Sequence, residues 1–71
     1  MDDEELAEYR RLAEVAAGHL SRYRELMEQW LADPARDRAL LRRADVEGRR
    51  LDRALADVYA FIERVLRRGL S

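Results

Sequence analysis

Residues 30–35 read WLADPA and contain the only proline of the chain. Asp33 can accept hydrogen bonds from the free backbone amides of a following helix, and Pro34 fits the first position of that helix, where no amide is needed. The preceding segment is rich in Ala, Leu, Glu and Arg, which favour helix. We therefore predict one helix over residues 2–32, a tight turn near 32–34 and a second, antiparallel helix over 34–68.

Both segments carry an unbroken heptad pattern, in which apolar residues alternate at steps of three and four. The first series is Leu6, Tyr9, Ala13, Ala16, Leu20, Tyr23, Met27 and Trp30, and the second is Leu41, Ala44, Gly48, Leu51, Leu55, Val58, Ile62 and Val65. A break at Gly48 would give three helices, but the heptad keeps its phase through this residue. An antiparallel hairpin instead places Tyr23 near Gly48, a large side chain over a small one.

Length and composition predict a single all-α domain covering residues 1–71. There is no cysteine for a disulfide or thiolate site, and no apolar run approaches the ~20 residues that a membrane span needs. The acidic stretch at residues 2–5 is the opposite of a secretion signal, so we expect a cytoplasmic protein without membrane contact. With no glycine-rich loop, and with serines that lack a base at triad spacing, no catalytic residue is predicted.

The residues flanking the heptads decide where a partner is expected. One flank carries Leu12, His19 and Leu26 on the first helix and Leu40, Glu47, Ala54 and Phe61 on the second; the other carries Arg10, Ala17, Arg24 and Leu31, with Asp45, Asp52, Tyr59 and Leu66. The second flank is charged enough to face water, and Arg24 is placed to meet Asp45. A two-helix hairpin has one seam, so the apolar first flank would stay exposed. Burying four of its large side chains is worth on the order of 6–10 kcal/mol before association costs.

We therefore expect a homodimeric four-helix bundle with Leu12, Leu26, Leu40, Ala54 and Phe61 at the interface. A different helical protein would cover the same surface equally well, and this alternative stays open.

His19 is the only histidine, and Glu47 lies at the matching height of the second helix. Two such pairs at a dimer axis would make a ligand set for zinc, and two histidines could ligate a haem iron. The structural alternative is a buried polar pair that fixes register and oligomer state. The spacing within one chain is not a metal motif, so we predict no required cofactor, with zinc or haem at His19 as the alternative.

A row of basic residues on the second helix offers a third hypothesis, binding of nucleic acid. Arg42, Arg43, Arg49, Arg50 and Arg53 could track phosphates along a stripe of about 17 Å at 1.5 Å per residue. Asp45, Asp52 and Asp57 interrupt it, and no aromatic residue lies among the arginines for base stacking. A solvated, salt-bridged face is favoured over a nucleic-acid surface.

The heptad hairpin and its length resemble the small helical-hairpin dimers typified by the plasmid regulator Rop, whose family pairs to bind RNA. The resemblance implies a dimeric four-helix bundle and transfers no site residue. The even heptads, the Asp33-Pro34 helix start and a basic set made only of arginine also resemble computationally designed bundles. That second resemblance implies a de novo protein whose role is assembly.

Overall fold

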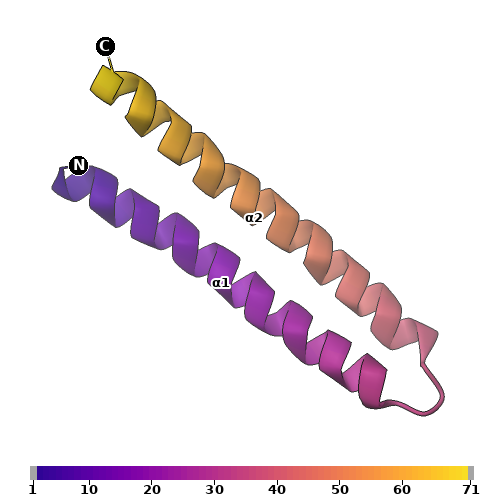
Figure 1. The fold of residues 1–71 in the computed structure, drawn as a ribbon. Coiled ribbons are helices and arrows are strands. Elements are labelled where there is room, and N and C mark those ends of the chain that lie inside the picture. The colour runs from indigo at the N-terminus through magenta and orange to yellow at the C-terminus, as the bar shows by residue number, and fades with distance from the viewer. Residues whose placement is uncertain (1, 71) are drawn as a thin grey trace.

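The computed structural model describes residues 2–70, with side chains described through residue 69. Two helices, α1 (Asp3–Ala32) and α2 (Arg38–Leu70), pack side by side and antiparallel, with both chain ends at one end of the hairpin (Figure 1). The predicted all-α hairpin is confirmed. Gly48 lies within α2, so residues 2–70 contain no third helix.

The start of α1 is fixed by side chains that satisfy its free amides. Asp2 precedes the helix and accepts a hydrogen bond from the Glu5 amide at 2.8 Å, while the Asp2 amide donates back to the Glu5 carboxylate at 3.4 Å. This reciprocal pair is a capping box, and the acidic first turn adds a favourable interaction with the helix dipole. The N-terminal acids are thus accounted for by helix formation.

The turn is longer than predicted, because α2 begins at Arg38 and not at residue 34. Asp33 does accept hydrogen bonds from following amides, those of Ala35 and Asp37, both at 3.0 Å. Arg36 then adopts a φ of 51°, which interrupts any helix begun at Pro34. Asp37 caps the new start by accepting from the Ala39 amide at 2.9 Å. A second Asx cap therefore sets the start of α2.

The line along which α1 and α2 pack, here called the seam, is made by one row of residues on each helix. On α1 the row contains Leu12, Ala16, His19, Tyr23, Leu26 and Trp30, and on α2 it contains Leu40, Ala44, Glu47, Leu51, Ala54, Val58, Phe61 and Val65, all buried or half-buried. Ala44 and Phe61 are the most enclosed, at 1% and 2% exposure. At Gly48 an added Cβ would lie 3.2 Å from the Tyr23 ring, which confirms the predicted large-over-small contact.

A second row on each helix, here called the outer face, lies beside the seam and is exposed. Its large members are Leu6, Tyr9, Leu20 and Leu31 on α1 and Leu41, Leu55, Tyr59, Ile62 and Leu66 on α2. Their spacings of three, four, eleven and fourteen residues are each close to a whole number of helical turns, which keeps each set on one side of its helix. A groove bordered by Tyr9, Leu20 and Leu55 shows that both sets belong to the same face of the hairpin. The predicted heptads therefore alternate between the seam and the outer face.

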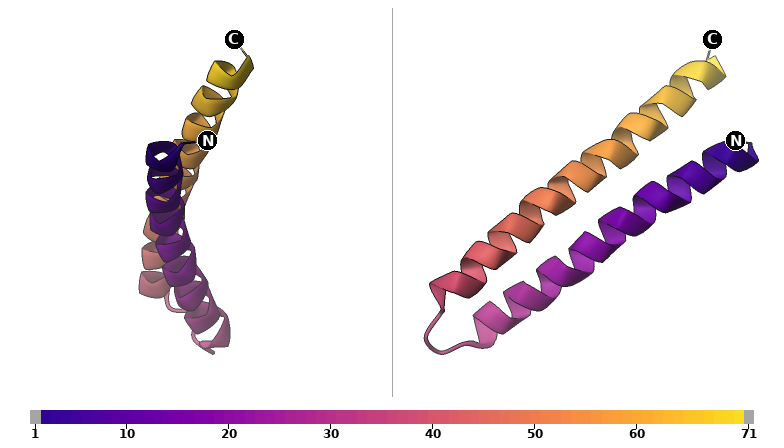
Figure 2. Two further views of the ribbon diagram at one scale, coloured as in Figure 1. Left: turned by 90° about the vertical axis from the view of Figure 1, so that its left-hand side faces the viewer. Right: turned by 180° about the vertical axis from the view of Figure 1, so that it is seen from behind.

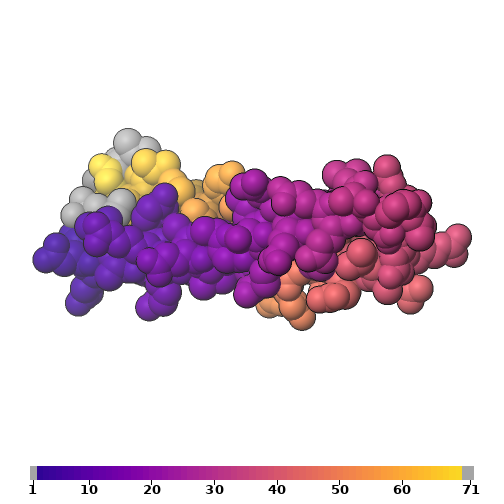
Figure 3. Space-filling model, turned by 90° about the horizontal axis from the view of Figure 1, so that it is seen from below, coloured from indigo at the N-terminus to yellow at the C-terminus, as the bar shows by residue number. Residues whose placement is uncertain are grey.

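The hairpin is a thin rod, with Cα extents of 55 × 18 × 12 Å. The helices cross at a shallow angle, as the side view in which they overlap shows (Figure 2, left). Seen from below, α1 runs along the length of the molecule and parts of α2 appear on both sides of it (Figure 3). No helix within residues 2–70 is both long and apolar enough to cross a membrane. Two helices alone leave every side chain outside the seam open to a partner.

Candidate functional site

The residues predicted to form the dimer interface lie between the two helices of one chain. Leu26, Ala54 and Phe61 are only 9%, 7% and 2% exposed, Leu12 packs against the core cluster that contains Ala54, and Leu40 is half-buried. The expectation that this flank stays exposed in a single hairpin was therefore wrong. The apolar stripe is wider than one seam, and the helices are rotated so that the flank faces inward.

His19 and Glu47 meet inside the seam, as their matching heights predicted. The His19 Nδ1 lies 3.1 Å from the Glu47 Oε2, and Glu47 is 8% exposed. Two arginines from opposite helices complete the cluster: Arg50 donates to the Glu47 Oε1 at 2.8 Å, and the Arg22 Nε lies 3.6 Å from the Oε2. The heptad analysis missed both arginines, because their long side chains reach the seam from positions beside it.

This cluster keeps Glu47 ionised. The hydrogen bond from His19 is the main cause that lowers the pKa of the Glu47 carboxyl below its ordinary value, and Arg50 and Arg22 act in the same direction. Burial opposes them, since it raises the pKa of a carboxyl group. The opposite charges and hydrogen bonds lower the pKa more than burial raises it, so Glu47 is a buried carboxylate whose charge and hydrogen bonds are satisfied.

A metal ion at His19 and Glu47 would have to compete with two guanidinium groups for the same carboxylate. Within the described part of the chain, no group of three or more histidine, cysteine, aspartate or glutamate side chains gathers where it could hold a metal. His19 also lies in the seam and not on the outer face. A second chain seated on the outer face would therefore not bring its His19 next to that of the first chain. The geometry favours the structural interpretation of the pair, in which it fixes the register of α1 against α2.

The five arginines predicted as a nucleic-acid stripe do not form one row. Arg42, Arg43 and Arg50 border a groove of about 550 Å³, to which α1 contributes Arg22. Arg49 instead pairs with Asp45 at 3.2 Å and lines a separate hollow beside Tyr23, and Arg53 borders neither. The arginine groove also contains Glu25 and Glu47, which reduce its positive charge. The structure divides the stripe and mixes it with acids.

The outer face holds most of the exposed large hydrophobic side chains among residues 2–69. Within that range, only Val15 and Val46 fall outside it by helical position. At its centre is a groove of about 290 Å³ whose floor is small, with Ala13, Ala16 and Ala17 between larger side chains from both helices. Sequence reasoning missed this surface because it placed six of its nine large residues inside the seam and the other three, Leu31, Tyr59 and Leu66, on a flank charged enough to face water. The available signal was the third apolar position in each heptad.

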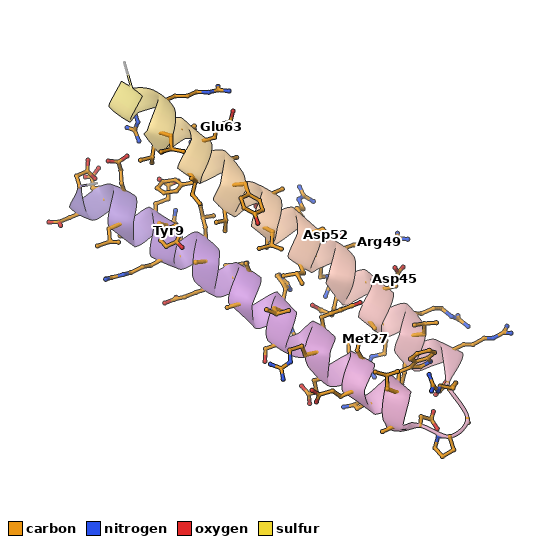
Figure 4. The ribbon with its side chains drawn as sticks, in the orientation of Figure 1. Tyr9, Met27, Asp45, Arg49, Asp52 and Glu63 are labelled. Carbon is orange, nitrogen blue, oxygen red and sulfur yellow. The ribbon has the colours of Figure 1, made fainter. Side chains whose placement is uncertain are left out.

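Charged residues border the outer face on both helices. The border of α1 carries Arg10 and Arg24, with Glu28 paired to Arg24, and the border of α2 carries Asp45, Asp52 and Glu63, with Arg49 paired to Asp45. The α2 acids are spread along the helix (Figure 4). The prediction that Arg24 meets Asp45 within the chain was wrong, because Arg24 pairs with Glu28 at 3.6 Å and Asp45 pairs with Arg49. These are exposed pairs within one helix, which are weak and can be exchanged.

No family model, curated protein sequence or solved structure matches this chain.

Proposed function

We propose that the chain is a protein–protein interaction module without catalytic activity, which pairs with a second copy through its outer face to form a four-helix bundle. The observation that carries the proposal is the partial burial of four large side chains of that face. Leu6, Tyr9, Leu55 and Ile62 are each 36% or 37% exposed, so the hairpin covers one side of these side chains and leaves the other open. Residues at the centre of a four-helix bundle have this property in each half of the bundle.

The amount of exposed apolar surface supports an obligate partner. The nine large side chains of the outer face expose on the order of 700 Å² together, above the few hundred Å² of a typical monomer patch and close to the roughly 800 Å² that each partner buries in a standard interface. At about 25 cal/mol per Å², covering them contributes on the order of 15 kcal/mol before association costs. A 71-residue chain has little other core to rely on.

The choice of a second copy rests on the shape of this surface. The outer face carries large side chains beside a floor of alanines, so it offers both the projecting groups and the depressions that a self-complementary interface requires. The architecture that results is that of the Rop-like hairpin dimers and of designed bundles, whose resemblance to this sequence is architectural. A different helical protein seated on the outer face is the competing outcome.

The test is the mass of the protein in solution, measured by sedimentation equilibrium. We expect about twice the chain mass of 8.4 kDa for the wild type. Leu55→Glu, which puts a charge in the middle of the outer face, should give a helical monomer. Val46→Glu is the matched control, because Val46 is exposed to a similar degree but lies on the opposite face. A monomeric wild type, or equal dissociation by both variants, would refute the proposal.

A further inference from the structure

The two copies could pair in either of two symmetric ways, and the structure distinguishes them. We propose that they pair with their turns at the same end, so that α1 of each copy packs on α2 of the other. The inference rests on the proposed dimer and adds its orientation. In the alternative the turns lie at opposite ends, and each helix packs on its own counterpart.

The heights of residues along the hairpin are fixed by contacts between α1 and α2. Glu5 pairs with Arg68, Glu8 with Arg64 at 3.6 Å, and the Tyr9 and Phe61 rings lie 6.4 Å apart. Nearer the turn, His19 contacts Glu47 and Tyr23 packs on Gly48, so residues at equal height have numbers that sum to between 66 and 73. A twofold axis parallel to the helices leaves heights unchanged, so the same sums apply between the copies when the turns lie at the same end.

In this same-end arrangement, two pairs of oppositely charged residues on the borders of the outer face come to similar heights. Arg24 stands level with Asp45 of the second copy, and Arg10 stands within one helical turn of Glu63 of the second copy. Symmetry repeats each pair, so four attractions flank the apolar interface. Charges beside an apolar seam select partner orientation in helical assemblies in this manner.

The opposite-end arrangement brings like charges together. When the two hairpins overlap fully, each residue of α1 faces a residue of α1 in the second copy that lies equally far on the other side of the helix middle, near residue 17. Arg10 therefore stands level with Arg24 of the second copy. On α2 the same reflection brings Asp45 toward Glu63 and places Asp52 beside its own counterpart. Sliding the copies apart would relieve these repulsions, but it would also uncover apolar surface at both ends.

Side-chain size leads to the same orientation. Tyr59 is the most exposed member of the outer face, at 66%. In the same-end arrangement, Tyr59 of one copy stands level with Ala13 of the other, over the groove floored by alanines. In the opposite-end arrangement it stands level with Gly48, in the part of the row occupied by Asp45 and Asp52. Only the same-end arrangement places the most exposed ring of the outer face over the groove floored by alanines.

Distances between spin labels on the two copies test the orientation directly. A label at Ala35→Cys, in the exposed turn, should give a separation on the order of 25 Å in the same-end dimer, since packed helix axes are about 10 Å apart. The opposite-end dimer would give a separation near the 55 Å length of the rod. A label at Ser21→Cys, near the middle of α1, should give a short distance in either arrangement.

Each outcome of this experiment is decisive. Short distances at both sites support the inference, whereas a short distance at Ser21 with a long one at Ala35 overturns the orientation and leaves the dimer intact. The absence of any distance at both sites, with the mass of a monomer, overturns the proposed function as well. The Ser21 label therefore separates failure of the orientation from failure of the dimer.

A charge exchange gives an independent check with an opposite sign in the two arrangements. Arg24→Glu should weaken dimerisation roughly three- to thirty-fold if Arg24 faces Asp45 of the second copy, and adding Asp45→Arg should restore it. In the opposite-end arrangement Arg24 faces Arg10, so the same single change would strengthen the dimer and overturn the inference. Circular dichroism should confirm that all variants keep their helix content.

Discussion

At the scale of single residues, the least expected feature is a charged cluster inside the seam. Periodicity predicted that His19 and Glu47 face each other, because height along a helix follows directly from residue number. The arginines that neutralise Glu47 could not be predicted in the same way. Arg22 and Arg50 reach the carboxylate from exposed backbone positions, and only their side-chain conformations bring them there. Three cationic or hydrogen-bonding partners on one buried carboxylate suggest a position where protonation is costly.

The pH dependence of stability follows from Glu47. Its folded-state pKa lies below the ordinary value of 4.5, so its contribution is fully present above that pH and is lost as the pH falls through the folded pKa. Urea unfolding between pH 5 and pH 3 should therefore show a loss of stability in the wild type that is smaller in Glu47→Gln. Glu14→Gln, an exposed change on α1, is the control and should keep the wild-type pH dependence. Identical pH profiles for Glu47→Gln and the wild type would contradict the assignment.

At the scale of the helices, local sequence signals predicted the ends unevenly. The start of α1 at its acidic N-terminus follows from capping and dipole rules, and its end at Ala32 follows from Pro34, which favours an extended conformation in the preceding residue Asp33. The start of α2 does not follow from these rules, because Asp33-Pro34 and Asp37 both favour a helix start. The sequence alone does not say which of the two positions begins the helix. The positive φ of Arg36 decides between them, and it is stabilised by its guanidinium group over the Trp30 ring at 4.7 Å.

The two mid-helix glycines provide a matched test of packing within the elements. Gly18 has open space around it, with its nearest neighbour a flexible Arg22 atom at 4.0 Å, whereas a Cβ at Gly48 would meet the Tyr23 ring at 3.2 Å. Gly18→Ala should therefore raise the free energy of unfolding by about 1 kcal/mol through helix propensity. Gly48→Ala should raise the free energy of unfolding less than Gly18→Ala does, or lower it, since the Tyr23 ring must move to admit the methyl group. Equal stabilisation in chemical denaturation would show that Tyr23 does not pack on Gly48.

At the scale of the whole molecule, the sequence predicted two helices, their direction and a surplus of apolar surface, but not which surface is in surplus. A heptad pattern fixes the direction of an apolar stripe along a helix. Here the stripe is three positions wide, so Phe61 and Ile62 are both plausible seam residues. The structure buries Phe61 to 2% exposure and leaves Ile62 at 36%. That choice depends on contacts between the helices, such as Tyr23 over Gly48 and Glu5 with Arg68, which no single helix encodes.

If the outer face is covered by a second copy, folding and pairing are one equilibrium, and thermal stability must depend on protein concentration. A dimer of this size has an unfolding enthalpy of about 100 kcal/mol, so its Tm should rise by about 5 °C for each tenfold increase in concentration. Leu55→Glu should melt at a lower temperature that does not change with concentration, because a hairpin that cannot pair unfolds alone. Val46→Glu should keep the wild-type slope. A wild-type Tm that is constant from micromolar to millimolar concentration would mean that the hairpin is stable by itself with its outer face in water.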